Sequence, residues 1–534
     1  MRKFSAIFTT APAFCLAFSF TLGVVAQLHH AGSWCLLGAM ILGGVALLRR
    51  RHGGFHLMSL AICALLGAGR MHSAERPAPH SYRKRLLNEL CSAELTLAIR
   101  DAPLLEGTLA AFDDERGLLT ADIIAMRLAT EDDFHPVTGR VSLTAGQFED
   151  REPLRRLHPG ECISAQGILS PAAYTDSLSA TYSDFLRSRG IFHQFEIFSF
   201  RREPSRPPNA IQRARLALRR LRVAIAERLV RNFHSAESAR LVLALGLGMS
   251  EFVPQDIRRR QLVSGTIHVF AISGMHIGMV TLMLALLLRG SGLPLRCQWS
   301  ALGILSACYV LLTGSSVSSI RALLMVWCAL YASFRHRRVA WLNALGCAEG
   351  IALLANPWQI LDLGFLYTHL TVMVLLLGAP LVQEHLRLLA ERKAWLPREL
   401  RPRHQTRLTQ WLVGGLDASL LAWLGNLGIS LHLNPQLSWG APFLNLPLGM
   451  LIALVLALCP IRLLLSVLAP RADAIWARLL EASMQLTEAV AESGHRSAFE
   501  FTHPIMPIWA AALYYAGFFT ILLCFYKLFN TNKL

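Results

Sequence analysis

Long runs of apolar residues are the main feature of this sequence, and most of them lie in its second half. A run of about 20 apolar residues can cross the ~30 Å hydrocarbon core of a bilayer as a helix. The pattern therefore predicts a polytopic α-helical membrane protein with about ten or eleven transmembrane helices. The predicted ranges are 4–26, 32–49, 55–69, 262–288, 297–314, 320–334, 339–355, 360–382, 411–433, 441–468 and 505–526.

One long interval, residues 70–206, contains no run of this kind. Its apolar and polar residues alternate over short stretches, which is typical of half-buried β-strands separated by turns. The interval therefore predicts a small β-domain, either a sandwich or a barrel. The alternating stretches are 93–99, 107–111, 140–143, 162–169 and 194–200.

Basic residues predict the side of the membrane on which this β-domain lies. Because Lys and Arg concentrate in cytoplasmic loops, Arg49, Arg50 and Arg51 place the loop after the second predicted helix, and with it the amino terminus, inside. Val24-Val-Ala26 resembles a signal cleavage site, but two further apolar runs follow at once, which favours an uncleaved first helix. The β-domain is then extracytoplasmic.

Charge changes sign directly after the β-domain. Residues 72–200 carry 13 Arg and Lys against 19 Asp and Glu, whereas residues 201–235 carry 10 Arg against 2 acidic residues. Apolar residues recur at helical spacing in the basic segment, which predicts an amphipathic helix. One interpretation is an interfacial helix held by anionic headgroups. The other is an electrostatic funnel in which Arg215, Arg219 and Arg222 receive phosphates.

A second amphipathic stretch, residues 472–492, carries fewer charges. We expect it to lie on the membrane surface, as a helix with one apolar face does.

Composition agrees with a membrane protein, since 53% of the 534 residues are hydrophobic and 16% are charged, against roughly 25% charged in soluble domains. The formal net charge of +17 has two explanations. It fits cytoplasmic loops that follow the positive-inside rule, and it fits attraction of a polyanion. The acidic interval 72–200 is a poor nonspecific platform for DNA.

The chain contains 11 cysteines, and most of them lie in apolar runs, where they act as small hydrophobic residues. Cys91 and Cys162 lie in the predicted β-domain instead. If that domain is exported, a disulfide between them is chemically permitted. No Cys/His spacing points to a metal site, so neither a metal nor another cofactor is expected.

The segment 264–278 is unusually polar for the start of a membrane helix. It contains two histidines, His268 and His276, with Ser273 between them, and three glycines. Polar groups are costly in hydrocarbon unless they line a cavity or pack against protein. The histidines are too far apart along a helix to chelate one metal. Two interpretations are open: a helix break that faces a water-filled cavity, and a tight helix–helix contact.

Two more polar groups interrupt the predicted membrane helices, at 313–321 and 362–369. Arg321 lies where an apolar run begins, so it needs a carboxylate, carbonyl groups, water or an anionic ligand. Glu349 and Asp362 are the nearest intramembrane carboxylates along the chain. A structural ion pair is favoured over a substrate contact.

Enzyme signatures are missing from the sequence. It contains no Walker-type phosphate loop, no HExxH pair and no His-x-His-x-Asp-His cluster of a two-metal nuclease. An intramembrane serine protease would place Gly-x-Ser-Gly around Ser273, but the first of these positions is Ala271. We therefore expect that the chain is not an enzyme.

These polar motifs resemble the signature of the ComEC/Rec2 competence proteins, the inner-membrane channel for DNA uptake in natural transformation. The most specific match is Gly265-Thr-Ile-His268 followed by Ala271-Ile-Ser-Gly-Met-His-Ile-Gly278. The resemblance covers most of the chain. Its supporting motifs are Leu243-Ala-Leu-Gly-Leu-Gly248, Leu312-Thr-Gly with Ser318-Ser-Ile-Arg-Ala322, Asn356-Pro with Asp362-Leu-Gly-Phe365, Ala441-Pro-Phe-Leu-Asn-Leu-Pro447, Leu157-His-Pro-Gly160 and Asp184-Phe-Leu-Arg-Ser-Arg-Gly-Ile191.

The resemblance implies a channel that passes single-stranded DNA across the bacterial cytoplasmic (inner) membrane, with a β-domain similar to the OB-like domain of the family. The implied partners are single-stranded DNA, membrane lipids, and a separate DNA receptor, nuclease and cytosolic translocase. The candidate channel-lining residues are His268, Ser273, Gly274, His276, Gly278, Ser318, Arg321 and Asp362.

Two departures from the family pattern stand out. Gly364-Phe-Leu-Tyr-Thr-His369 replaces the usual Gly-Phe-Gln-Leu-Ser-Phe. Many relatives also carry a carboxyl-terminal metallo-β-lactamase-like domain, thought to degrade the non-transported strand, and we expect a short form without it. The alternatives to a DNA channel are a channel or transporter for another solute on the same fold, and a non-transporting membrane scaffold of the uptake machinery.

The expected organisation has four parts. Residues 1–69 form the amino-terminal transmembrane helices, and residues 70–206 form the extracytoplasmic OB-like domain. Residues 207–235 form the basic amphipathic helix, and residues 236–534 form the transmembrane channel domain.

Overall fold

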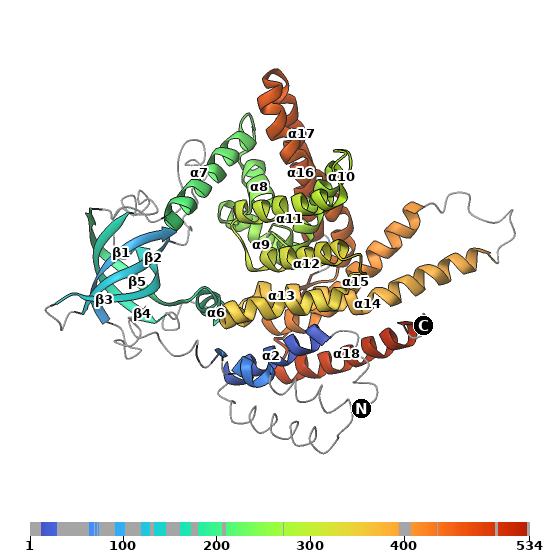
Figure 1. Cartoon of the computed structure of the whole chain (residues 1–534), viewed down its shortest axis with the longest axis horizontal. Helices are drawn as coiled ribbons and strands as arrows, with labels where there is room; N and C mark the ends of the chain where they lie inside the picture. The colour runs from blue at the N-terminus through green and yellow to red at the C-terminus, as the bar shows by residue number, and fades with distance from the viewer. Residues whose placement is uncertain are drawn as a thin grey trace, which may run out of the picture. The chain divides into compact units, whose positions relative to one another are not determined.

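The computed structural model (Figure 1) describes residues 12–28, 63–73 except 69 and 72, 91–101, 119–128, 133–145, 161–171, 180–204, 210–394 except 271, 407–502 except 435 and 497–499, and 504–530. Its contacts divide the chain into two units. The first comprises Met1–Glu227 and Gly346–Phe365, and the second comprises Arg228–Leu345 and Leu366–Leu534. The predicted β-domain therefore belongs to the first unit, and most of the predicted channel region belongs to the second.

The first unit contains a five-stranded closed barrel (Figure 1). The barrel has the strand order β1-β2-β3-β5-β4. β3 and β5 pair in parallel, and the other neighbours pair antiparallel. The small β-domain expected from alternation is thus confirmed as a barrel. Its strands are β1 (Cys91–Asp101), β2 (Leu119–Leu128), β3 (His135–Ala145), β4 (Cys162–Pro171) and β5 (Ile191–Glu203).

The barrel interior is filled by apolar side chains from alternate strand positions. Leu95, Leu97, Ile163 and Phe195 are fully buried there. Successive side chains on a strand point to opposite faces, so Glu94, the neighbour of Leu95, lies on the outer face and pairs with Arg127 of β2. This alternation closes a dry core and leaves charged groups on the outside.

β2 was not among the strands expected from the sequence. Its ladders with β1 and β3 both carry an irregularity between Ile123 and Ala125. A bulge inserts an extra residue and moves the following side chains to the opposite face, so the alternation of β2 changes phase midway. The predicted stretch at 107–111 lies outside the described residues.

The register of β1 against β4 excludes the disulfide considered for Cys91 and Cys162. Cys91 pairs with Leu169, and Ala98 pairs with Cys162. The cysteines therefore lie at opposite ends of this ladder, about seven residue steps or ~23 Å apart. A disulfide needs Cα atoms within about 7 Å. Cys162 is buried with a free thiol.

Helical segments of the first unit contact the barrel through α6 (Ala180–Ser188) and η5 (Pro357–Leu361). Asn356 donates from Nδ2 to the Ser188 carbonyl oxygen at 2.8 Å, and its Oδ1 accepts from the Trp358 amide. The rings of Trp358 and Phe192 meet edge to face with centroids 5.3 Å apart. The Asn-Pro motif therefore begins η5 and ties it to α6, while Trp358 packs against β5 of the barrel.

The second unit is almost entirely helical. Its elements are the end of α7 (Ala210–Val230), α8 (Ala236–Leu247), η3 (Ser250–Phe252), α9 (Gln255–Val263), η4 (Ile267–Phe270), α10 (Gly274–Arg289), α11 (Leu295–Leu312), α12 (Val317–Phe334), most of α14 (Leu363–Ala394), α15 (Arg407–Leu433), α16 (Ala441–Leu468), η6 (Pro470–Ala472), α17 (Asp473–Arg496) and α18 (Ile508–Asn530). β6 (Gln436–Ser438) and β7 (Glu500–Thr502) form a short antiparallel pair. α13 (Trp341–Ala355) is shared between the units.

Among the described residues, five helices are long and apolar enough to cross a membrane: Leu295–Leu312, Val317–Phe334, Leu363–Leu388, Gln410–Leu433 and Ala441–Leu468. Three shorter apolar helices are Gly274–Arg289, Trp341–Ala355 and Trp509–Phe525. These eight correspond to the last eight predicted spans. α2 (Pro12–Leu28) overlaps the first predicted span, and the second lies outside the described residues.

Candidate functional site

The polar segment 264–278 is broken into three pieces, so the continuous span predicted for 262–288 is wrong. α9 ends at Val263, η4 covers Ile267–Phe270, and α10 begins at Gly274. Between the first two, Gly265 has φ +73°, and a Cβ there would lie 3.1 Å from the Ala441 Cβ at the start of α16. A side chain would meet both backbone strain and a close neighbour. The segment is therefore interrupted, as one interpretation predicted, and it also packs closely against α16, as the other predicted. A water-filled cavity beside it stays a prediction.

A reciprocal cap begins α10 after the break. The Ser273 amide donates to Nδ1 of His276 at 3.3 Å, and the Ser273 hydroxyl lies 2.8 Å from the same nitrogen. His276 takes the place of the Glu or Gln that usually closes a capping box at this position. Its side chain is fully buried, so in this structure the imidazole holds the start of a helix.

Glycine contacts bring three of the sequence motifs together. Gly248 ends α8 with φ +71°, and a Cβ there would lie 2.5 Å from the Thr313 carbonyl oxygen and 2.8 Å from Ile272 Cδ1. On α10, a Cβ at Gly274 would lie 3.7 Å from the Ala322 Cβ of α12. The motifs around 248, 272 and 313 thus pack around a backbone approach that only glycine permits.

The polar groups of α12 and α14 have distinct settings. Ser318 Oγ lies 3.3 Å from Thr368 Oγ1, so the helix pair is joined by hydroxyls. Arg321 is buried on α12 with 3% of its surface exposed. Asp362 precedes α14, and its Oδ1 accepts from the Phe365 amide at 3.0 Å. Asp362 therefore has the geometry of a helix N-cap. Glu349, the other carboxylate considered as a partner for Arg321, accepts a hydrogen bond from the Thr21 hydroxyl at 2.6 Å.

The predicted lining residues differ in accessibility. His268 is exposed on η4, where Nδ1 lies 3.1 Å from the Gly265 carbonyl oxygen. Gly278 is exposed too, and open space surrounds a Cβ placed there. His276 and Arg321 are buried within the chain. Of the eight candidate lining residues, His268 and Gly278 are therefore the exposed ones.

The basic segment forms one helix, α7, as predicted. Its buried face consists of Val223, Ala226, Leu229 and Val230, whereas Leu221 is 53% exposed. Arg215 is exposed, and Arg219 and Arg222 are half-buried. Of the three funnel candidates, Arg215 is the most accessible.

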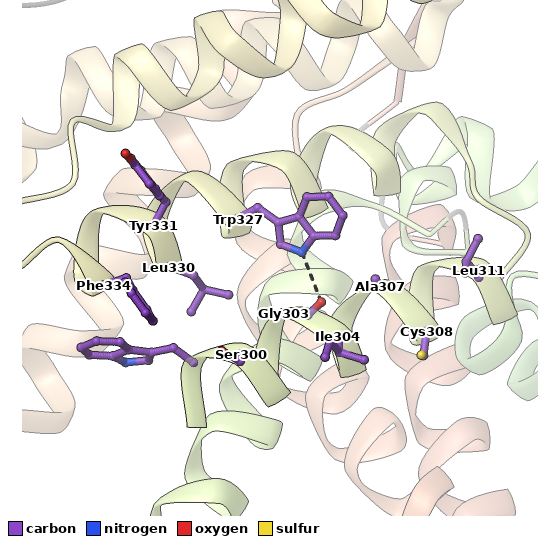
Figure 2. A pocket seen from close by; sticks show the side chains of 11 residues that line it. Ser300, Gly303, Ile304, Ala307, Cys308, Leu311, Trp327, Leu330, Tyr331 and Phe334 are labelled. Atoms are coloured by element: carbon purple, nitrogen blue, oxygen red, sulfur yellow. Dashed lines mark hydrogen bonds between the residues drawn. The ribbon is translucent and has the colours of Figure 1, made fainter. Parts of the chain in front are cut away.

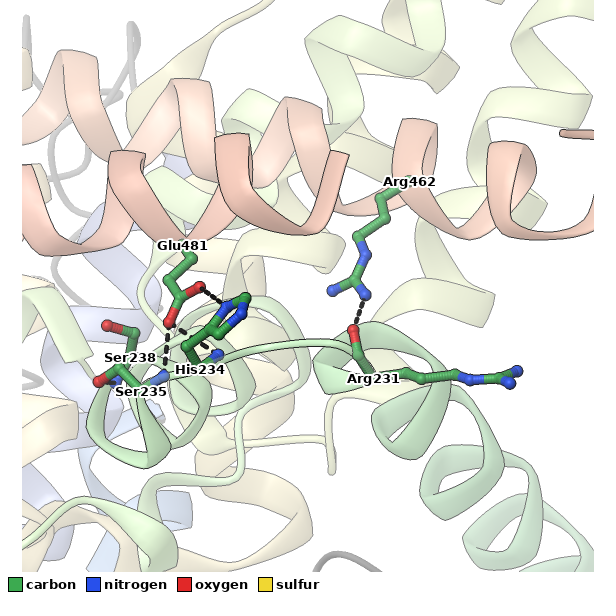
Figure 3. Close-up of polar contacts among 6 residues, drawn as sticks. All are labelled: Arg231, His234, Ser235, Ser238, Arg462 and Glu481. Atoms are coloured by element: carbon green, nitrogen blue, oxygen red, sulfur yellow. Dashed lines mark hydrogen bonds and ion pairs between the residues drawn. The ribbon is translucent and has the colours of Figure 1, made fainter. Parts of the chain in front are cut away.

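A buried arginine that sequence reasoning did not single out lies near the end of α16. Arg462 donates to the carbonyl oxygens of Leu229 and Arg231, the last of these shown in Figure 3. Its guanidinium also lies 3.6 Å from the Asp473 carboxylate and 5.0 Å from the centre of the Phe233 ring. The signal was present in the sequence, because an arginine inside an apolar run needs partners.

Glu481 of α17 is the acidic counterpart of this arrangement (Figure 3). Its Oε1 accepts from the backbone amides of His234 and Ser235 at 3.1 and 2.5 Å, and its Oε2 lies 3.5 Å from His234 Nδ1. Ser235 in turn begins α8 by accepting from the Ser238 amide at 3.2 Å. α16 and α17 therefore hold the connection between α7 and α8 with one buried charge each.

Comparison with known proteins points to one family. The family model described as Competence protein matches residues 245–528, which include the broken segment and all five long apolar helices. The ComE operon protein 3 of Bacillus subtilis (strain 168) is 25% identical over 311 residues, which are 58% of this chain and 36% of that protein. The chain thus spans about a third of the length of this curated relative. No solved structure matched significantly.

Proposed function

Because the chain belongs to the ComEC/Rec2 family of competence proteins, we propose that this multi-pass membrane protein forms a channel for single-stranded DNA in the bacterial cytoplasmic membrane and acts in natural transformation. The observation that carries the proposal is the broken, glycine-rich segment 264–278, which the family model covers and which lies among apolar helices. Broken helices with polar residues at membrane depth are typical of transport pathways.

A strand of phosphates needs a wet path with positive or hydrogen-bonding walls. Among the candidate lining residues of the broken segment, His268 and Gly278 are exposed, and Ser318 adds a hydroxyl on α12. Arg215 on α7 is exposed, and its charge would attract phosphate. We assign capture, strand degradation and driving force to a separate DNA receptor, nuclease and cytosolic translocase.

The barrel has a supporting part in this proposal. A closed five-stranded barrel with the order β1-β2-β3-β5-β4 fits an OB-like fold, a five-stranded Greek-key barrel. Its acidic composition disfavours a nonspecific hold on DNA. We therefore assign it to the extracytoplasmic side, as a collar or as a docking surface for other uptake proteins.

Transformation frequency tests the lining assignment, in a competent strain whose own family member is deleted. Gly278→Asp and Gly278→Asn have nearly the same size but differ in charge. Repulsion between a wall carboxylate and phosphate should lower transformation about tenfold or more for Asp relative to Asn. The same pair at Gly517, an exposed glycine with open space on α18, should show no such charge effect at matched protein levels.

Two outcomes would favour other functions. Equal frequencies for Asp and Asn at Gly278, combined with loss of transformation on deleting the chain, would favour a non-transporting scaffold. No binding of a labelled single-stranded oligonucleotide by the purified chain, even at low salt, would favour a channel for another solute, since DNA affinity grows as salt falls.

A further inference from the structure

A groove on the surface of the α11–α12 hairpin is not used by the proposed DNA path. It has a volume of about 460 Å³, and both helices contribute its walls (Figure 2). Figure 2 shows aromatic and aliphatic side chains along its length, with Trp327 and Gly303 near the middle. The volume is within the range of small-molecule sites, roughly 300–1,000 Å³.

The walls of the groove are mostly apolar, and the indole N–H of Trp327 is already hydrogen-bonded within them. The Trp327 indole N–H donates to the Gly303 carbonyl oxygen at 3.2 Å. A Cβ at Gly303 would make ordinary contacts, 3.4 Å from Leu330 and 3.6 Å from the indole nitrogen, so the ring packs directly against α11. Ile304 and Tyr331 remain 63% and 69% exposed along this surface. The groove therefore suits an apolar occupant from the bilayer.

One end of the groove carries a cluster of arginines. Arg296, at the start of α11, lies over the Phe334 ring with its guanidinium 5.5 Å from the ring centre. Beyond α12, the chain turns back at His336, which has φ +52°, with the Arg337 amide donating to the Ala332 carbonyl oxygen at 2.8 Å. Arg335, Arg337 and Arg338 are exposed in this turn. The groove thus joins an apolar body to a cationic end.

Length favours a lipid chain. The groove extends from Trp299 to Leu311, which on a helix corresponds to about 18 Å. One leaflet of hydrocarbon is about 15 Å thick, half of the ~30 Å core. The Trp299 ring packs 6.1 Å from that of Phe334 and 6.2 Å from that of His336, and aromatic side chains of this kind mark the level of the headgroups.

We propose that this groove binds an acyl chain of an anionic phospholipid, whose phosphate is held by Arg296, Arg335 and Arg337. Basic sites beside transmembrane helices attract anionic headgroups, and the apolar walls accept the chain. A helix from a second copy would cover the groove without using these charges. The charged backbone of DNA is not complementary to the apolar walls of the groove.

Tryptophan quenching by lipids with brominated acyl chains tests the site on the purified full chain in detergent. Phosphatidylglycerol should quench at a lower mole fraction than phosphatidylcholine, and Trp327→Phe should remove much of that quenching. Arg335→Gln with Arg337→Gln should weaken the preference for phosphatidylglycerol roughly tenfold or more. The matched control is Arg259→Gln with Arg471→Gln, two arginines exposed elsewhere, which should keep the preference.

A second variant tests the acyl-chain part independently of charge. Cys308 is exposed and lines the groove, so Cys308→Phe should fill it and reduce quenching by both lipids. Leu282→Phe, at a 61% exposed position of α10, should not. Equal quenching by the two lipids in the unmodified chain would overturn the proposal. So would a dimer that Cys308→Phe converts to a monomer, because a second copy would then be the occupant.

Discussion

The guanidinium of Arg462 lies 3.6 Å from the carboxylate of Asp473, across the turn where α16 is followed by α17. The same side chain donates to the carbonyl oxygens of Leu229 and Arg231. One arginine therefore joins the α16–α17 corner to the end of α7. Because it is 1% exposed, its charge is compensated by these contacts rather than by bulk water.

We expect Arg462→Met to be among the most destabilising single substitutions in the second unit. It keeps most of the apolar stem but leaves Asp473 buried without this cation, and breaking a buried pair typically costs about 3–5 kcal/mol. Thermal unfolding of the purified chain in detergent measures the effect. Arg471→Met, at an exposed position nearby, is the matched control, and equal midpoints for the two variants would contradict the structural role of Arg462.

The cap of α10 predicts opposite results for two substitutions of His276. His276→Gln keeps a hydrogen-bonding group at the position where capping boxes use Glu or Gln, so it should retain most of the stability. His276→Leu leaves the Ser273 amide without its acceptor and should cost roughly 1 kcal/mol or more. Unfolding midpoints separate them. If transformation is lost with Gln while the midpoint is unchanged, the imidazole has a part beyond capping.

Gly248 and Gly292 form a pair that separates backbone strain from crowding. Both have positive φ, +71° and +69°, but a Cβ at Gly248 would lie 2.5 Å from the Thr313 carbonyl oxygen, whereas open space surrounds Gly292. Gly292→Ala should cost about 1 kcal/mol of unfolding free energy, the strain of the left-handed region. Gly248→Ala should cost clearly more. Similar losses for both would show that the contact with Thr313 relaxes freely.

Glu488 on α17 predicts a dependence of stability on pH. Partial burial raises the pKa of this carboxyl from 4.5 to about 7, helped by the nearby carboxylates of Glu237 and Glu492 and opposed by Arg260. The unfolded chain ionises Glu488 near pH 4.5, while the folded chain resists ionisation until about pH 7. The contribution of Glu488 to stability is therefore full below pH 4.5 and falls between pH 4.5 and 7.

Glu488→Gln should reduce the decrease in unfolding free energy between pH 4.5 and 7 by roughly 1 kcal/mol. The effect is small because the carboxyl is half-exposed and therefore screened by solvent. Unfolding midpoints measured from pH 4.5 to 7.5 provide the comparison. Glu203→Gln, at an exposed position of β5, should leave the slope unchanged. An unchanged slope in Glu488→Gln would mean that the folded and unfolded chains ionise this carboxyl alike.

Hydrophobic periodicity predicted secondary structure correctly wherever local sequence alone determines the structure of a segment. The apolar helices α11, α12, α15 and α16 lie close to their predicted ranges because length and hydropathy alone select a membrane helix. β2 was missed because a bulge between Ile123 and Ala125 changes the phase of its alternation. The suggestion of a disulfide between Cys91 and Cys162 was wrong, because strand register depends on pairing between segments that are distant in the sequence.

In the broken segment of the candidate site, too, one part was predictable from local pattern and another depended on distant contacts. Its glycines, serine and histidines indicated an interruption, and the sequence alone left a helix break and a tight helix contact open. The structure combines features of both: the helix is interrupted, and Gly265 lies against Ala441 and Gly248 against Thr313. These neighbours are separated by tens or hundreds of residues along the chain, so no local pattern predicts them.

Local patterns were enough to establish the class of this protein, its apolar helices, the interval that forms the barrel and the family motifs, because hydrophobic periods and motif spacing are local properties. Long-range packing was needed to establish that His276 is a buried cap, that His268 and Gly278 are exposed, and that Arg462 and Glu481 hold the α7–α8 connection. Burial and hydrogen-bond partners depend on which distant segments meet, and the free energy of a polar group in an apolar unit depends on those partners.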